Sequence, residues 1–452
     1  MCCGHYMGCC TEAAAMLPEC NERRAIRMRP PAIETFARKR IVWPMAVLST
    51  TLCYPSAAAP LQGVFVERRL AAISRRIPLA VVAPVPWFPF VRPMSFDPRE
   101  QCSGTPPVWR PRMFYFPGLF KEQDAWFYER ALLRACRHLK SSFDFQVIDA
   151  HFEWPDGVGA FHAARRLSVP FVCTLRGKLV SQARHPRKRE KIAEMLRGAD
   201  ALMAVSASLA QLACEVARAD LTVHVIPNGV DSIVFHRIDE GQGPAAPAPS
   251  LRQALGWPAT ARIAVSVGHL QELKGFHRLV AIWPAVRRQV GDARLVLVGG
   301  PAGEPNYEQR LNRQMMSLGL TEFVTLEGRV PQARVARILN AADLFVLASR
   351  SEGWCNAIAE SLACGCPVVA TDVGGNREII SDDRCGRLVD AARHESLESE
   401  VCRGLTARWD RRVIAEFGGR RSWQQVADEC VDVLKGVMGS SSSRVSRPRR
   451  TA

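Results

Sequence analysis

From residue 41 onward, short apolar runs typical of strands alternate with amphipathic segments typical of helices, and this alternation most constrains the fold. Parallel strands need a crossover between them, usually a helix, so the pattern favours parallel α/β architecture over all-β or all-α. In the first half we expect strands at 41–50, 79–84, 145–151, 170–175, 201–205 and 222–226, and helices at 64–76, 126–139, 157–167 and 187–197. These segments amount to one complete doubly wound unit.

The alternation stops at residues 238–250 and then starts again. This stretch contains Gly-Gln-Gly-Pro-Ala-Ala-Pro-Ala-Pro, which is too rich in glycine and proline for the interior of a helix or strand. Beyond it we expect strands at 262–267, 293–299, 324–327, 344–347 and 367–371, and helices at 275–288, 307–318, 332–341 and 356–364. The chain therefore predicts a second parallel α/β unit, with ligands bound at the carboxyl ends of the strands.

The length of 452 residues fits two domains and a tail, at roughly 150 residues per domain. The Pro- and aromatic-rich stretch 85–120 has no clear assignment and could be an excursion that covers a site. We expect an N-terminal extension, a first domain, a linker, a second domain, C-terminal helices and a basic disordered tail, at 1–38, 39–235, 236–258, 259–396, 397–438 and 439–452 respectively. The extension is either disordered or an over-long translation start, since Met28 and Met45 lie downstream.

Charge restricts the partners without choosing among them. The chain has 60 Lys and Arg against 44 Asp and Glu, a net charge of +16 that attracts nucleic acid, anionic lipid or phosphorylated substrates. The two terminal Arg clusters lie in low-complexity segments and are best interpreted as solvated tails. The central cluster, 184–191, and Arg68, Arg69, Arg75 and Arg76 are open to two interpretations, a solvated helix face or reversible contact with an anionic membrane surface.

Cysteine usage and hydropathy indicate the compartment. The 16 cysteines are mostly scattered through hydrophobic segments, as reduced buried thiols are, and those in residues 1–20 lack the spacing of a zinc site. The longest apolar runs, 41–52 and 79–91, are short or broken by proline, so we expect no membrane-spanning helix. These observations predict a cytoplasmic protein, with peripheral attachment to the membrane as an option.

Two carboxylates follow the expected strand at 344–347. Glu352 lies in the loop after this strand and Glu360 lies two turns into the next helix, a spacing of seven intervening residues. Carboxylates accept hydrogen bonds from sugar or ribose hydroxyls, and the free backbone N–H groups where the helix begins, near Asn356, favour an anion such as a diphosphate. The pattern predicts a nucleotide or sugar site at this edge of the sheet.

A lysine stands after the expected strand at 262–267. The sequence Gly-His-Leu-Gln-Glu-Leu-Lys-Gly places Lys274 between this strand and the next helix, where it can neutralise phosphate. There is no Walker sequence and no Gly-x-Gly-x-x-Gly opening a helix, which disfavours a P-loop ATPase or an ordinary dinucleotide enzyme. Gly374 and Gly375 form a further turn lined by backbone, with Glu378 nearby.

Taken together these motifs resemble the retaining glycosyltransferases of family 4, which have the GT-B fold of two Rossmann-like domains. The resemblance covers residues 41–437 or so. It rests on Ile-Pro-Asn-Gly-Val-Asp at 226–231, the segment 268–275, and the run from Ser349 through Glu352, Glu360 and Gly374 to Ile380. The stretches His-Phe-Glu-Trp-Pro-Asp-Gly at 151–157 and Thr-Leu-Arg-Gly at 174–177 are similar to members that build exopolysaccharide or lipid-linked glycans.

The resemblance implies an acceptor domain first, a donor domain second, and C-terminal helices that pack back on the first domain. Glu360 would hold ribose hydroxyls, and Lys274 and His269 would grip the diphosphate. Gly63 would lie close to the donor. The donor sugar would be held by Glu352 and by the backbone of Gly353, Trp354, Cys355 and Asn356. Such enzymes need no metal or other cofactor, and the chain has no Asp-x-Asp motif.

Two positions depart from the family pattern. Many relatives have Arg where this chain has His269, and an imidazole supplies only a partial charge at neutral pH unless phosphate raises its pKa. Arg176 stands where many relatives have His near the reacting sugar; it cannot act as a base but can bind hydroxyls or phosphate. His151 is open to both a catalytic and a structural interpretation. We count Glu352, Lys274, His151 and Arg176 as the candidate catalytic residues.

The sequence therefore predicts a metal-independent retaining enzyme that moves a sugar from a nucleotide-diphosphate donor to a glycan or lipid-linked acceptor in surface polysaccharide synthesis. The alternatives are a sugar-nucleotide epimerase of the same fold, a glycogen-type phosphorylase, and a basic nucleic-acid-binding protein. The phosphorylase is disfavoured because it needs a Lys-bound pyridoxal phosphate and a longer chain. No specific nucleic-acid partner is expected, since the Arg clusters that suggest one lie at the ends.

Overall fold

The computed structural model describes residues 45–89, 106–140, 142–238 and 250–445. The chain divides into two compact units, residues 1–40 and 41–452, and the fold described below belongs to the second. The expected N-terminal extension at 1–38 lies outside the described residues, as do residues 239–249 of the linker and 446–452 of the tail.

The first sheet has seven strands, all paired in parallel, in the order β4-β2-β1-β6-β7-β8-β9. The strands are β1 (Val47–Thr50), β2 (Leu79–Val82), β4 (Val108–Trp109), β6 (Val147–His151), β7 (Phe171–Leu175), β8 (Ala201–Ala204) and β9 (Val223–Val225). The central strands β1, β2, β6 and β7 are buried along their whole length. This is why most of their residues are apolar, although β6 also carries the buried polar residues Asp149 and His151.

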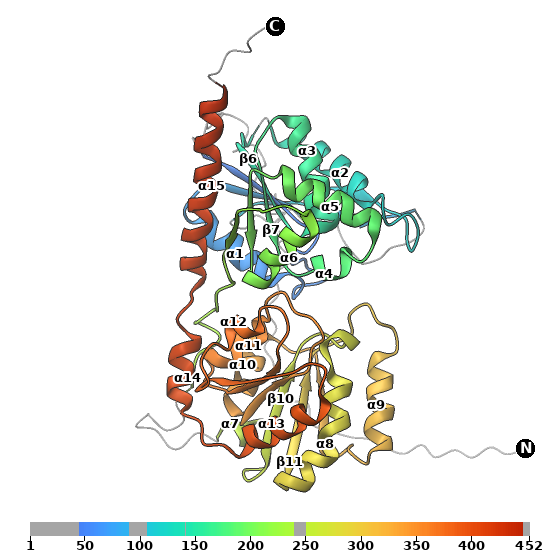
Figure 1. Cartoon of the computed structure of the whole chain (residues 1–452), viewed down its shortest axis with the longest axis vertical. Coiled ribbons are helices and arrows are strands. Elements are labelled where there is room, and N and C mark those ends of the chain that lie inside the picture. The colour runs from blue at the N-terminus through green and yellow to red at the C-terminus, as the bar shows by residue number, and fades with distance from the viewer. Residues whose placement is uncertain (1–44, 90–105, 141, 239–249, 446–452) are drawn as a thin grey trace, which may run out of the picture. The chain divides into compact units, whose positions relative to one another are not determined.

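Helices cover both faces of this sheet (Figure 1). Helices α1 (Val64–Ser74) and α15 (Trp423–Val445) pack on one face and share a core with Val47, Val147 and Val172. The other face is covered by α2 (Asp124–Leu139), α3 (Val158–Leu167), α5 (Pro186–Gly198) and α6 (Ala207–Ala217). Because side chains alternate along a strand, β6 sends Ile148 and Ala150 to this second face.

The second sheet has six parallel strands in the order β12-β11-β10-β13-β14-β15. They are β10 (Arg262–Val267), β11 (Ala293–Val298), β12 (Val324–Gly328), β13 (Leu344–Leu347), β14 (Val368–Thr371) and β15 (Gly386–Val389). One face packs against α8 (Phe276–Val290), α9 (Tyr307–Ser317) and α13 (His394–Thr406), and the other against α10 (Gln332–Ala341), α11 (Asn356–Ala363) and α14 (Arg411–Gly418).

Strand order reverses once in each sheet, and these reversals fix where a ligand can bind. In the first sheet β1 lies between β2 and β6, and in the second β10 lies between β11 and β13. Loops leaving β1 and β6, or β10 and β13, diverge to opposite faces and leave space at the carboxyl ends of the strands. The two parallel doubly wound sheets confirm the expected fold class.

Shorter elements complete the chain. A small parallel ladder pairs β3 (Val85–Trp87) with β5 (Arg112–Phe114), within the segment that the sequence left unassigned. The remaining turns are η2 (Glu153–Gly157), α4 (Leu179–Gln182), α7 (Leu251–Ala254), η3 (Glu272–Lys274) and α12 (Asn376–Ile379). Within the described ranges, no helix has the length and apolar character needed to cross a bilayer.

The structure differs from the expected boundaries in the linker and in the C-terminal part. Ser250 and Gln253 form a reciprocal capping box, so α7 begins inside the expected linker. Helices α13 and α14 contact α8 and α11 of the second sheet, whereas α15 contacts α1 of the first. The expectation that 397–438 returns as a whole to the first domain therefore holds for α15 alone among these three helices. That helix continues to Val445, into the expected disordered tail.

Gly275 offers a test of this packing. Its φ is +73°, and a Cβ there would lie 2.0 Å from the carbonyl oxygen of Ala348. Gly256 has nearly the same φ, +70°, but nothing lies within 4 Å of its Cβ position. We expect Gly256→Ala to lower the free energy of unfolding by about 1 kcal/mol and Gly275→Ala to lower it by about 3 kcal/mol or more. Only the second substitution adds a steric clash to the backbone strain. Thermal unfolding of the two variants measures the difference, and equal losses would contradict the expected contact.

Candidate active site

The candidate site centres on an ion pair between the loops that follow β10 and β13. The Lys274 ammonium lies 2.7 Å from Oε1 and 2.9 Å from Oε2 of Glu352. Ser349 Oγ donates a further hydrogen bond of 2.7 Å to Oε1. Burial is the largest single influence and acts to lower the pKa of Lys274. The charge of Glu352, a contribution from Cys355 and the hydrogen bond to Glu352 together exceed it, so the pKa is raised and the ammonium stays protonated. The structure thus brings together two residues that lie 78 positions apart.

Glycines allow the backbone to close around this pair. Gly374 has φ +54°, and a Cβ there would lie 1.7 Å from the carbonyl oxygen of Glu352. Thr371 Oγ1 donates to the carbonyl oxygen of Ser349 over 2.7 Å, which ties the end of β14 to the same loop. The loop that carries Glu352 is therefore held by the end of β14 and by the turn that follows it.

The start of α11 lies directly after this loop. Cys355 occupies the N-cap position without a side-chain hydrogen bond to the helix, so the first backbone N–H groups of α11 have no side-chain cap. Burial, reinforced by the charge of Glu352, raises the pKa of the Cys355 thiol to about 12, so the thiol is neutral. This arrangement of uncapped N–H groups beside Lys274 favours an anion.

A second set of contacts begins at the carboxyl ends of β6 and β7. Nε and NH2 of Arg176 lie 3.2 and 3.0 Å from His151 Nδ1, and NH1 donates to Asn228 Oδ1 over 3.3 Å. Asn228 Nδ2 in turn donates to Asn356 Oδ1 over 3.0 Å. Arg176 and the first residue of α11 are therefore linked through one asparagine.

His151 is a neutral residue in this arrangement. It is fully buried, and burial, together with the charge of Arg176, lowers its pKa to about 4 although Asp149 acts in the opposite direction. Nε2 lies 3.1 Å from Asp149 Oδ2, but without the alignment of a good hydrogen bond. Because Nδ1 accepts from Arg176, the ring proton belongs on Nε2. His151 thus serves here as an acceptor that positions Arg176.

Two further buried carboxyls, Glu153 and Asp156, lie in η2 after β6. Glu153 Oε1 accepts from the backbone N–H of Arg176 over 3.1 Å, and burial raises the pKa of Glu153 to about 7. Asp156 accepts from Leu52 N and Thr51 Oγ1, and burial raises its pKa to about 6. Both belong to a stretch that the resemblance had marked without assigning roles to these two residues.

The remaining predicted residues lie around these contacts. Gly353 packs against Gly177, since a Cβ on Gly353 would lie 2.7 Å from Gly177 Cα. Gly63, with φ +73°, begins α1 and packs on the carbonyl oxygen of Cys53. Trp354 Nε1 is buried without a hydrogen-bond partner among the described residues. Burial raises the pKa of Glu360 to about 7, although Arg68 nearby acts to lower it.

His269 lies close to Lys274, as expected, but it is not a cation. Burial lowers the pKa of its imidazole, and the charges of Lys274 and Arg329 lower it further. Arg329 follows β12 at the same edge of the sheet, and its Nε would lie 3.1 Å from a Cβ on Gly300. Sequence analysis missed Arg329 and Asn228; the strand end before Arg329 was the signal that could have identified it.

Several side chains of the basic segments form hydrogen bonds, ion pairs or ring contacts within the protein. Arg69 is fully buried and donates to the carbonyl oxygen of Ile226, so both interpretations left open for it, a solvated helix face and contact with a membrane, are wrong. Arg68 pairs with Asp231 over 2.8 Å. In the cluster 184–191, Arg187 pairs with Glu122 over 2.9 Å, and Lys188 lies over the Trp154 ring.

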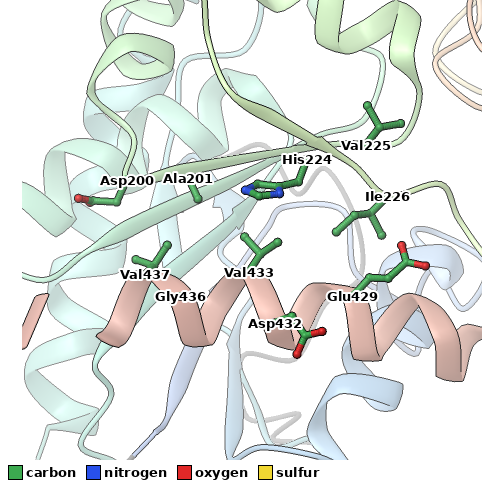
Figure 2. A pocket seen from close by; sticks show the side chains of 10 residues that line it. All are labelled: Asp200, Ala201, His224, Val225, Ile226, Glu429, Asp432, Val433, Gly436 and Val437. Carbon is green, nitrogen blue, oxygen red and sulfur yellow. The ribbon is translucent and has the colours of Figure 1, made fainter. Parts of the chain in front are cut away.

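A groove of about 720 Å³ lies elsewhere, between the β8–β9 edge of the first sheet and α15. Figure 2 shows His224 and Val433 on the two walls, with the Asp432 carboxylate pointing away from His224. None of the predicted site residues lines this groove. We therefore place the candidate active site at the strand ends described above and not in this groove.

Two parallel doubly wound sheets, with Lys274 and Glu352 at the switch point of the second, define a glycosyltransferase of the GT-B type. Sequence models agree: "Glycosyltransferase Family 4" matches residues 74–232 and "Glycosyl transferases group 1" matches residues 248–418. The chain belongs to glycosyltransferase family 4.

Curated relatives carry related names. The chain is 30% identical over 331 residues to a D-inositol 3-phosphate glycosyltransferase of Xylanimonas cellulosilytica, covering 71% of this chain and 77% of the relative. It is 29% identical to the putative teichuronic acid biosynthesis glycosyltransferase TuaC of Bacillus subtilis, covering 73% and 82%.

Solved structures share the fold. Sucrose-phosphate synthase from Thermosynechococcus elongatus superposes with a TM-score of 0.72 at 19% identity, covering 88% of this chain and all of that one. Anabaena HepE in complex with UDP-glucose superposes with a TM-score of 0.61 at 19% identity, with the same coverage.

Glu153 gives a pH-dependent test of the geometry around Arg176. Its pKa is raised in the folded state, so its contribution to stability is present below the unfolded pKa of 4.5 and is lost as pH rises through about 7. Between pH 5 and pH 8, the free energy of unfolding of the wild type should fall by roughly 2 kcal/mol relative to that of Glu153→Gln. Thermal unfolding across this range measures the difference. Glu322→Gln, on an exposed turn, is the control, and parallel profiles for wild type and Glu153→Gln would contradict the expected burial.

Proposed function

We propose that this chain is a retaining, metal-independent glycosyltransferase that moves a sugar from a nucleotide-diphosphate donor to a glycan or lipid-linked acceptor in surface polysaccharide synthesis. The observation that carries the proposal is the buried Lys274–Glu352 pair beside the uncapped start of α11. The named relatives support it: TuaC is a putative teichuronic acid biosynthesis enzyme, and HepE was solved with UDP-glucose.

In this proposal each group has one task. The diphosphate lies at the N–H groups that begin α11, with Lys274 as its cation. Glu360 accepts hydrogen bonds from ribose hydroxyls, and Glu352 with the backbone of residues 353–356 holds the sugar. His269 contributes an uncharged contact, because its pKa is lowered, and Arg329 supplies the positive charge that His269 lacks.

Catalysis then depends on charge at the leaving group. As the bond between sugar and diphosphate lengthens, negative charge grows on the diphosphate, and Lys274 and the N–H groups of α11 stabilise it in place. Lys274 can serve because the charge of Glu352 keeps it protonated inside the protein. Independence from metal belongs to the proposal and is tested by activity in EDTA.

The proposed contact with a lipid-linked acceptor involves basic residues on the first domain. Arg184 and Lys191 are exposed on and beside α5 of the first sheet, where they could meet anionic headgroups around a lipid-linked acceptor. Release of free nucleotide diphosphate only when acceptor is present distinguishes sugar transfer from epimerisation.

The donor site is tested first by binding. We expect UDP, GDP or ADP to raise the melting temperature without metal, and Glu360→Ala to lose this shift because it removes the acceptor for ribose hydroxyls. Each shift is measured against the variant's own melting temperature. Glu308→Ala, exposed on α9, is the matched control, and a full shift in Glu360→Ala would exclude the assigned role.

The leaving-group role of Lys274 is tested by turnover. Lys274→Met should lower kcat by roughly 100- to 1,000-fold, the cost of removing one preorganised stabilising group. Lys435→Met, exposed on α15, should leave kcat unchanged. Single-turnover measurement on folded variants checks this, and retained kcat in Lys274→Met would remove the lysine from the chemistry.

A further inference from the structure

The guanidinium of Arg176 is held by neutral groups. Its hydrogen-bond partners are the His151 ring nitrogen and the Asn228 side-chain oxygen, and it lies over the Phe65 ring at 5.3 Å. Among the described residues, Arg176 forms no ion pair with a carboxylate. His151 supplies no negative charge either, because an imidazole is neutral or cationic and its pKa of about 4 leaves this one neutral.

Burying the charged guanidinium of Arg176 costs free energy. Arg176 is only 9% exposed, and a buried charge is normally paired with an opposite one. Burial and the nearby charge of Arg69 lower the pKa of Arg176 to about 9, which still leaves it charged at neutral pH. Asp149 offsets part of this repulsion from the far side of His151.

The guanidinium also has donors to spare. It carries five N–H groups, and three of them, one on each nitrogen, form hydrogen bonds with residues that the structure describes. One N–H therefore remains on each terminal nitrogen, the pair that matches the two oxygens of a carboxylate.

Its position places these donors next to the expected donor site. A Cβ on Gly353 would lie 2.9 Å from the carbonyl oxygen of Arg176, and Asn228 bridges the guanidinium to Asn356. A second buried group beside it lacks a partner: Thr174 Oγ1, fully buried, forms no hydrogen bond among the described residues.

We propose that Arg176 binds a carboxylate on the sugar of the donor, so that the substrate class of this enzyme is a nucleotide-linked uronic acid. This inference rests on the proposed function. The diphosphate already has Lys274 and the start of α11 as partners, both on the second sheet. Arg176 belongs to the first sheet, and its two remaining donors can bind the two oxygens of a carboxylate.

The test compares matched donors on the full-length protein by calorimetry. UDP-glucuronate is compared with UDP-glucose, UDP-galacturonate with UDP-galactose, and GDP-mannuronate with GDP-mannose. For the nucleotide that the protein binds, we expect the acidic sugar to bind about 10- to 100-fold more tightly than its neutral counterpart, as one charge-assisted pair provides.

Variants assign this preference to Arg176. Arg176→Met should reduce the preference to less than about threefold while UDP or GDP alone binds nearly as before, and Arg176→Lys should keep part of it. Arg187→Met, an exposed arginine of the first domain, should behave as wild type.

The outcomes separate the two proposals. Binding without preference for acidic sugars in the wild type overturns this inference and leaves the proposed function standing. If Arg176→Met binds UDP or GDP and every sugar nucleotide more weakly by the same factor, the guanidinium binds the diphosphate. That result also overturns this inference. No binding of any nucleotide overturns the proposed function and this inference with it. If Arg176→Met does not fold, the wild-type comparison still decides.

Discussion

The site depends on the ion pair between Lys274 and Glu352. The pair forms only because β10 and β13 are neighbours in the sheet and end at the same edge. Its geometry then fixes the surrounding backbone: Gly275 must pass against Ala348, and Gly374 against the carbonyl of Glu352. Breaking such a pair leaves one buried charge uncompensated, which is why removal of either partner is expected to cost more than the pair contributes.

The two sheets bring different kinds of cation to the site. Lys274, on the second sheet, is balanced by Glu352, so donor binding there rearranges an existing charge pair. Arg176, on the first sheet, is balanced only at a distance, and its direct partners are neutral. A ligand anion therefore gains more from Arg176 than from an already paired lysine, because the desolvation of the arginine has been incurred in folding. This asymmetry favours discrimination by the first sheet and charge stabilisation by the second.

Much of the fold could be predicted from the sequence. Buried parallel strands appear as apolar runs, and β10, β13 and α10 have the expected boundaries. Helix α6 was missed although Ser206 caps it, since its stretch is apolar overall and rich in alanine. The C-terminal helices were assigned as one group because sequence order does not reveal which sheet a helix covers.

The site was predictable in part, for the same physical reasons. Lys274 and Glu352 follow strand ends, so their edge of the sheet could be expected, although their direct contact could not. The burial of Arg69 was not predictable, because two adjacent arginines on an amphipathic helix are normally expected to face solvent. In the structure α15 packs against this helix. Asn228 has no spacing signal: its role arises only where Arg176 and Asn356 meet.

The position of Asn228 depends on the end of the chain. The N–H of Val230 donates to the carbonyl oxygen of Arg421, and Arg421 Nε donates to the carbonyl oxygen of Pro227. A Cβ on Gly229 would lie 2.6 Å from the backbone of Ser422, so only glycine lets these two segments approach so closely. The segment before α15 thus holds residues 227–230 in place, and through Asn228 it positions the guanidinium of Arg176 against the start of α11. The C-terminal crossover is therefore part of the construction of the site, and it explains why a helix far along the sequence returns to the first sheet.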